Sequence, residues 1–143
     1  MNDFKRCLEL GRIVKVSKNE DWIKKELEEA EYDLSRSKAS IEKEDYKWAI
    51  VQGYYSMFHA AKALVLSEGY REKSHQCLII ALRELFIKTQ RLDEKFADQF
   101  ENAMDLRHQA DYGLEYSSDE ASIIIEHSEE FLKVIKRILK DNK

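Results

Sequence analysis

The densest group of reactive side chains lies in the run 105–112, which reads DLRHQADY. Arg107 and Asp111 are four residues apart, and so are His108 and Tyr112. In an α-helix, residues at this spacing share a face, so the four side chains would fall within about 140° of one another. A guanidinium, an imidazole, a carboxylate and a phenol gathered there can hold a phosphate and move a proton. From spacing alone, the more ordinary interpretation is an exposed Arg107–Asp111 ion pair with His108 in water.

A second line of polar side chains interrupts the apolar segment 45–69. Gln52, Tyr55, His59 and Lys62 would lie within about 80° of one another on a helix built from this segment. The rest of the circumference is apolar, which is typical of a central helix with neighbours on several sides. The polar line therefore either meets water or forms one wall of a site.

Ser74 and His75 form a third candidate, because Ser74 is placed to cap a helix that starts at His75. An imidazole at a helix start can contact an anion, but a capping or surface role explains it equally well. Glu72 and His75 form an E-x-x-H pair, which occurs once, whereas di-iron bundles need two such pairs. P-loop, G-x-G-x-x-G, H-E-x-x-H and paired C-x-x-C motifs are also absent. We therefore expect neither a cofactor nor a metal site.

The elements that must position these residues are helices. The segment 45–69 has Asp45 as its N-cap and Gly69 at its end, and small residues recur along one strip at Ala49, Gly53, Ser56 and Ala60. Such a strip allows close approach of another helix. Further helices are predicted over 2–14, from a Ser17–Glu20 capping box to Ile41, over 75–89, from Asp93 to Tyr112 and from Ser117 to Ile138. The prediction is an all-α, antiparallel four- to five-helix up-and-down bundle with a short extra N-terminal helix.

The composition supports a single helical domain. The chain has 143 residues, 43% of them apolar and 36% charged, with no proline and only four glycines. We expect one domain over 1–143, with 1–16 as a peripheral helix and 17–141 as the bundle. No apolar run is long enough for a membrane span and no secretory signal precedes the first helix, so a cytoplasmic protein without membrane contact is expected. Cys7 and Cys77 are interpreted as small buried apolar side chains.

The net charge is −4, which argues against a general nucleic-acid coat but leaves room for a local basic pocket. Three separated motifs give a more specific indication. The runs 54–64 (YYSMFHAAKAL), 74–75 (SH) and 106–113 (LRHQADYG) resemble, in this order, the small stand-alone HEPN proteins of prokaryotes, and the resemblance spans about residues 22–139. It implies a helical bundle that is usually homodimeric, often pairs with a minimal nucleotidyltransferase, and in many members acts as a metal-independent ribonuclease toxin.

The ribonuclease motif of that family is an arginine, a polar residue directly after it and a histidine four to six residues further on. Arg107 and His108 match the first two positions, but the residue five after Arg107 is Tyr112, and no histidine lies within 109–126. A phenol with a pKa of about 10 is a poor general base near neutrality. Tyr112 can still hydrogen-bond a phosphate or stack on a base, and His108 can serve as the base if the helix end turns it into the pocket.

The leading hypothesis is an HEPN-type protein that binds a nucleotide or RNA phosphate at Arg107, with metal-independent RNA cleavage as the reaction if it is an enzyme. Two alternatives are a non-catalytic binding or regulatory subunit of a nucleotidyltransferase and a purely structural helical dimer. Arg107, His108 and Tyr112 are the candidate catalytic residues. The candidate binding residues are Asp111, Tyr55, His59, Lys62, Ser74 and His75.

Overall fold

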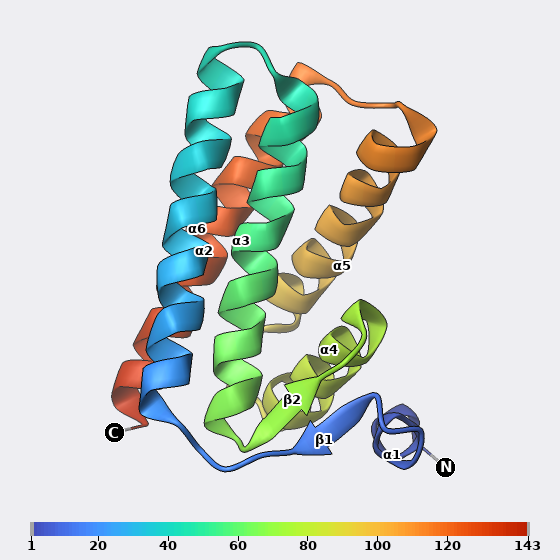
Figure 1. Ribbon diagram of the computed structural model, residues 1–143, viewed down its shortest axis with the longest axis vertical. Helices are drawn as coiled ribbons and strands as arrows, with labels where there is room; N and C mark the ends of the chain where they lie inside the picture. Colours follow the sequence, from blue (N-terminus) through green and yellow to red (C-terminus); the bar gives the residue numbers. More distant parts are fainter. Residues whose placement is uncertain (1, 143) are drawn as a thin grey trace.

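The computed structural model describes residues 2–142 and has the predicted architecture, an antiparallel helical bundle with a short extra helix at its N-terminal end (Figure 1). Two short π-helical segments, η1 and η2, extend α4 and α5. The elements in chain order are α1 (Asp3–Glu9), β1 (Ile13–Lys15), α2 (Glu20–Glu42), α3 (Tyr46–Ser67), β2 (Tyr70–Glu72), α4 (His75–Leu82), η1 (Arg83–Ile87), α5 (Glu94–His108), η2 (Gln109–Gly113) and α6 (Ser118–Asp141).

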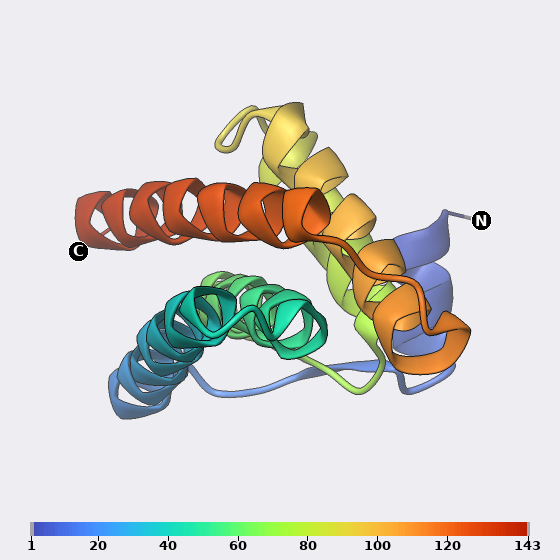
Figure 2. The same cartoon turned by 90° about the horizontal axis from the view of Figure 1, so that it is seen from above.

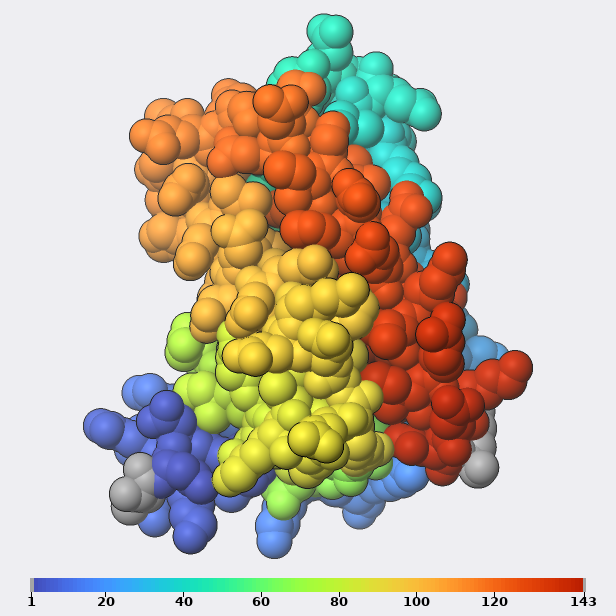
Figure 3. All heavy atoms as spheres, turned by 180° about the vertical axis from the view of Figure 1, so that it is seen from behind, coloured from blue at the N-terminus to red at the C-terminus, as the bar shows by residue number. Residues whose placement is uncertain are grey.

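α3 is the central helix, as its apolar circumference predicts. It packs against α2 on one side and α6 on another, and α5 crosses at a third side (Figures 1 and 2). Seen from behind, α6 in red and the yellow to orange segment that contains α5 form the middle of the surface, with the blue N-terminal segment at its lower edge (Figure 3). Within residues 2–142, no helix has both the length and the hydropathy of a membrane span.

The strip of small residues on α3 lets the neighbouring backbones come close. Ser56 donates a hydrogen bond to the carbonyl oxygen of Ala30 in α2 at 2.7 Å, and Ser128 of α6 donates to the carbonyl oxygen of Gly53 at 2.7 Å. A Cβ atom on Gly53 would overlap the Ile124 side chain of α6. The close packing that the strip predicts is therefore confirmed, and buried serines satisfy their hydroxyls on partner backbones.

The N-terminal helix is shorter than predicted. α1 ends at Glu9, Gly11 takes a positive φ of 70°, and Ile13 lies in strand β1 instead of on a helix face. β1 pairs antiparallel with β2, in a register that places Ile13 opposite Glu72. The prediction of a helix over 2–14 is wrong in its last turn because a glycine in the left-handed region reverses the chain there.

The two cysteines are buried as predicted, each with 4% exposure, but they are not independent apolar side chains. Cys7 of α1 and Cys77 of α4 form a disulfide, with Cα atoms 6.0 Å apart. The disulfide fastens α1 to α4. The sequence could not reveal this pairing because 70 positions separate the two residues.

Most predicted caps are confirmed. The exception is Ser17, because the side chain of Asn19 accepts the hydrogen bond from the backbone N–H of Trp22 and α2 starts at Glu20. Asparagine is as good an N-cap as serine, and it lies directly before the first helical residue. The predicted caps that the structure confirms are Asp45, Ser74, Asp93 and Ser117.

Candidate functional site

Arg107 lies in the last turn of α5 and is directed at α3. Its guanidinium carbon is 5.2 Å from the ring centroid of Tyr54 and 5.9 Å from that of Tyr55. Only 16% of the Arg107 side chain is exposed. A guanidinium over aromatic faces is held by cation–π attraction, which strengthens as water is excluded. The ordinary interpretation is therefore right about the Arg107–Asp111 ion pair and about the exposed His108, but wrong in placing the Arg107 guanidinium in water.

The hydrogen-bonding capacity of this guanidinium is largely unused. Among the residues that the structure describes, its one carboxylate partner is Asp111, with 3.5 Å between Nη1 and Oδ2, which is the long limit for a hydrogen bond. The Nε atom is buried and has no hydrogen-bond partner within residues 2–142. An arginine carries five N–H donors, so Arg107 retains donors for an anion.

His75 contacts the same two tyrosine rings as Arg107. Its Nδ1 is 2.6 Å from the hydroxyl oxygen of Tyr54, and its ring stacks on Phe58 with centroids 4.3 Å apart. Ser74 caps α4, the helix that begins at His75, because the Ser74 hydroxyl accepts a hydrogen bond from the backbone N–H of Cys77 at 3.0 Å. The Tyr54 ring therefore contacts both Arg107 and His75.

The surroundings of the Tyr54–His75 pair disfavour charge on both partners. Burial lowers the pKa of His75, and the positive charges of Arg107 and Lys62 lower it further. Burial raises the pKa of Tyr54 well above its usual range, and the charge of Arg107 opposes this only in part. The imidazole is therefore neutral near pH 7 and the phenol keeps its proton. A neutral imidazole is the form that accepts a proton in general-base catalysis.

His108 and Tyr112 lie on the exposed rim beside this cluster. Their ring centroids are 4.9 Å apart, and Tyr112 is 70% exposed. Segment η2 continues α5 beyond His108 to Gly113, and its C-cap Leu114 has a positive φ of 58°. The two predicted side chains are thus brought together, but at the surface rather than against Tyr54.

The predicted polar line on α3 divides into separate environments. Tyr55 lies under Arg107, whereas His59 and Lys62 contact acidic residues outside α3. Lys62 Nζ is 3.2 Å from Oε2 of Glu26 and 3.9 Å from Oε1 of Glu72. Burial alone would raise the pKa of Glu26, but His59 and Lys62 outweigh it and lower that pKa; burial raises the pKa of Glu72.

Gln52, at the start of the same line, contacts α2 and is removed from the acidic residues. Its side-chain amide forms a hydrogen bond with the Ser40 hydroxyl at 2.7 Å. The polar line is therefore not one continuous wall. Gln52 joins α3 to α2, Tyr55 supports Arg107, and His59 and Lys62 form ion pairs.

In the sequence, Tyr54 and Phe58 count only as apolar bulk, although in the structure they form the floor on which Arg107 and His75 lie. One signal was available for Tyr54. A tyrosine on the buried face of a helix normally needs a partner for its hydroxyl. Identifying His75 as that partner required the fold, because 21 positions separate the two residues.

Comparison with known proteins identifies the family. Residues 22–138 match the family model of the HEPN domain. "Putative toxin MJ0605" and "Putative toxin MJ0142" of Methanocaldococcus jannaschii are 33% and 32% identical to the chain, over 80% and 82% of it and 87% and 81% of their own lengths. A "UPF0332 protein" of Archaeoglobus fulgidus is 30% identical over 86% of this chain and 99% of its own.

A solved structure supports the fold independently. The crystal structure of TT1696 from Thermus thermophilus superposes with a TM-score of 0.70, at 18% identity, over 81% of this chain and 97% of that one. This likeness concerns the fold alone. Because the family match covers most of the chain and the archaeal relatives align over most of its length, the chain belongs to the HEPN domain family.

Proposed function

We propose that this HEPN protein binds RNA at the surface around Arg107 and cleaves it without a metal ion, with His75 in the role of the histidine that the motif lacks. The observation that carries the proposal is the guanidinium of Arg107, which lies over Tyr54 with unused donors, beside a neutral imidazole bonded to the same tyrosine. The exposed ring of Tyr112 also suits a single-stranded ligand, whose bases stack on aromatic side chains.

In the proposed reaction, the 2′-hydroxyl of the RNA attacks the adjacent phosphorus. His75 Nε2 takes the hydroxyl proton in the tautomer whose Nδ1–H donates to the Tyr54 oxygen, and this 2.6 Å contact fixes the ring. Arg107 stabilises the negative charge that develops on the phosphoryl oxygens. The new bond joins the 2′-oxygen to phosphorus, and the bond from phosphorus to the 5′-oxygen breaks. That oxygen receives the proton of the Tyr112 hydroxyl, at the rim that Tyr112 forms with His108, and the protonated His75 restores the phenol through solvent.

The names of the archaeal relatives and the family resemblance support a toxin role. In this proposal the chain forms a homodimer and pairs with a minimal nucleotidyltransferase that restrains it. The other candidate binding residues then have separate tasks: Asp111 orients Arg107, Tyr55 supports it, and Ser74 caps the helix that presents His75.

A second candidate function is a non-catalytic binding subunit of a nucleotidyltransferase. The segment after α5 favours it, because Tyr112, Leu114 and Tyr116 are 70%, 72% and 47% exposed. Exposed aromatic and aliphatic side chains gathered on one segment are typical of a surface that another protein covers.

The test is incubation of untagged protein with end-labelled single-stranded RNA in excess chelator. Wild-type protein should cleave it, Arg107→Ala and His75→Gln should not, and Arg137→Ala, which removes an exposed arginine of α6, should cleave at the wild-type rate. Cleavage by Arg107→Ala at that rate would overturn the proposal. RNA binding by the wild type with no cleavage would favour the second candidate.

A further inference from the structure

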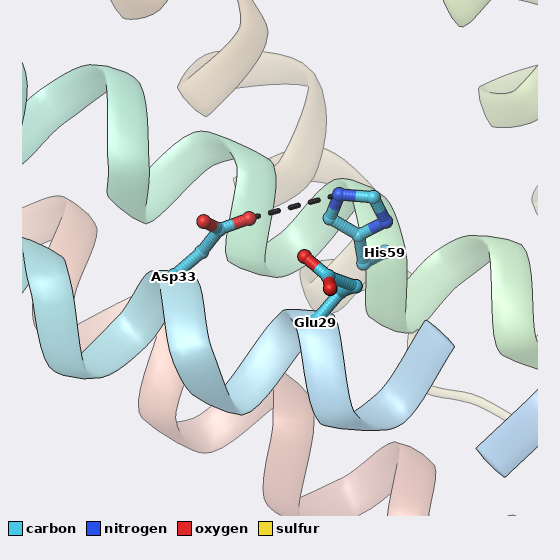
Figure 4. Close-up of side chains that lie close together, drawn as sticks. All are labelled: Glu29, Asp33 and His59. Atoms are coloured by element: carbon cyan, nitrogen blue, oxygen red, sulfur yellow. Dashed lines mark ion pairs between the residues drawn. The ribbon is translucent and has the colours of Figure 1, made fainter. Parts of the chain in front are cut away.

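A cluster of metal-ligating side chains lies on the α2–α3 face, outside the Arg107 group. Glu29 and Asp33 are four residues apart on α2 and share a face, and His59 of α3 is directed at them (Figure 4). One carboxylate oxygen from each acid and one ring nitrogen of His59 all lie within 4.8 Å of one another. Nε2 of His59 is 3.6 Å from Oδ2 of Asp33.

We propose that Glu29, Asp33 and His59 bind one divalent first-row transition-metal ion, for which Zn²⁺ is the suitable probe. Metal–ligand bonds of about 2.0–2.2 Å place neighbouring ligand atoms roughly 3–3.5 Å apart. The Asp33–His59 separation of 3.6 Å is close to that range, and the remaining gap closes by side-chain rotation of Glu29, which is exposed. The ion bridges α2 to α3 and keeps its other positions for water.

An independent observation concerns the far side of the imidazole. Nδ1 of His59 is buried without a hydrogen-bond partner within residues 2–142, and it lies 3.5 Å from Oε1 of Glu26. Glu26 is itself only 7% exposed, and it forms an ion pair with Lys62. A proton on Nδ1, directed at this carboxylate, leaves the Nε2 lone pair facing Asp33 and Glu29. Metal-bound histidines are typically oriented in this way by a carboxylate on their other nitrogen.

The charges around the cluster also suit a cation. Within residues 2–142, neither Glu29 nor Asp33 forms an ion pair with a lysine or arginine, and the nearby Lys62 is already paired with Glu26 and Glu72. One imidazole with two carboxylates favours Zn²⁺ or Mn²⁺ over Mg²⁺ and Ca²⁺, which prefer oxygen ligands alone. The sequence alone indicates no metal site because Glu29 and Asp33 are far from His59 in the chain and match no motif.

The experiment uses untagged, disulfide-bonded protein that has been treated with chelator and dialysed. Calorimetric titration with ZnCl₂ should give one ion per chain, Zn²⁺ should raise Tm, and Co²⁺ should give visible d–d absorption bands. Asp33→Asn, Glu29→Gln and His59→Gln should each weaken Zn²⁺ binding at least about tenfold, and Glu26→Gln by about 10–100-fold through the orientation of His59. Glu28→Gln, which removes an exposed charge next to the site, should bind as the wild type does.

The proposal is overturned if the wild type binds no stoichiometric Zn²⁺, or if Asp33→Asn and Glu29→Gln retain wild-type affinity. Far-UV circular dichroism and the metal-free Tm show whether each variant is folded. If His59→Gln does not fold, the two carboxylate variants at the surface of α2 decide the outcome. The result is separate from RNA cleavage, which is tested in excess chelator.

Discussion

The hydroxyl of Tyr54 and Nδ1 of His75 lie 2.6 Å apart, and Arg107 lies over the same Tyr54 ring. Three residues from α3, α4 and α5 are thereby coupled through one phenol. This relationship gives the missing motif histidine a candidate replacement from a different helix, and it makes Tyr54 the residue on which the orientation of the imidazole depends.

Tyr54→Phe should slow RNA cleavage about tenfold or more while RNA affinity changes little. The variant keeps the ring under Arg107 but removes the hydrogen bond that orients His75, at a cost in stability of about 1–2 kcal/mol. Cleavage rates at saturating RNA and binding by fluorescence anisotropy separate the two effects. Tyr116→Phe, which removes an exposed phenol, is the control. Equal rates for Tyr54→Phe and wild type would exclude a positioning role for Tyr54.

Arg107→Gln should raise the pKa of His75, because burial and then the charge of Arg107 are the leading causes of its depression. NMR titration of the His75 ring protons measures this directly. Lys62→Gln should raise the same pKa by a smaller amount, and Arg137→Gln should leave it unchanged. A His75 pKa that does not move in Arg107→Gln would mean that the guanidinium does not act on the imidazole.

The lowered pKa of His75 also makes the stability of the protein depend on pH. The folded state binds the His75 proton less readily than the unfolded state, whose histidine pKa is about 6.5. The stability contribution of His75 is therefore present above pH 6.5 and is lost as the pH falls through that value towards the folded pKa. Urea unfolding at pH 7.5 and pH 5.5 should show a larger loss for wild type than for His75→Gln, which has no proton to gain. An equal loss in both proteins would contradict this assignment.

Much of the fold follows from local patterns. Asp45, Ser74, Asp93 and Ser117 start helices as their positions predict, because an N-cap is a contact within one turn. The features that the sequence does not predict, strand β1 and the disulfide, depend on residues that are distant in the chain. β1 forms only because β2 lies beside it, and the disulfide joins helices that the sequence alone does not bring together.

The candidate site divides in the same way. Arg107 and Asp111 lie together as predicted, because a spacing of four residues places two side chains on the same face of a helix. Tyr54 was missed because its role comes from His75 of α4 and Arg107 of α5, which reach it only in the folded bundle. Glu26 was missed for a related reason: it is a buried acid of α2 whose partners, His59 and Lys62, belong to α3.

Gly53→Ala should destabilise the protein by about 1–3 kcal/mol, because the added methyl overlaps Ile124 at the α3–α6 contact. Gly113→Ala is the matched control, since its nearest neighbouring atom would be at 4.0 Å and no positive φ is required there. Equilibrium urea unfolding of both variants measures the difference. If Gly53→Ala is as stable as wild type, then α6 can shift without loss and the small-residue strip does not fix the helix spacing.

Reduction of the Cys7–Cys77 disulfide should lower the free energy of unfolding by about 4 kcal/mol, because the bond closes a long loop and restricts the unfolded chain. Thermal and urea unfolding with and without dithiothreitol measure the effect. A Cys7→Ser, Cys77→Ser double variant should have the free energy of unfolding of the reduced wild type, and dithiothreitol should not change it. Hydrogen exchange should locate the change: α1 and the β1–β2 amides should lose protection first, while the α3 amides stay protected, because the bundle has contacts of its own. Uniform loss of protection across α3 and β1 would instead mean that the N-terminal segment and the bundle unfold as one unit.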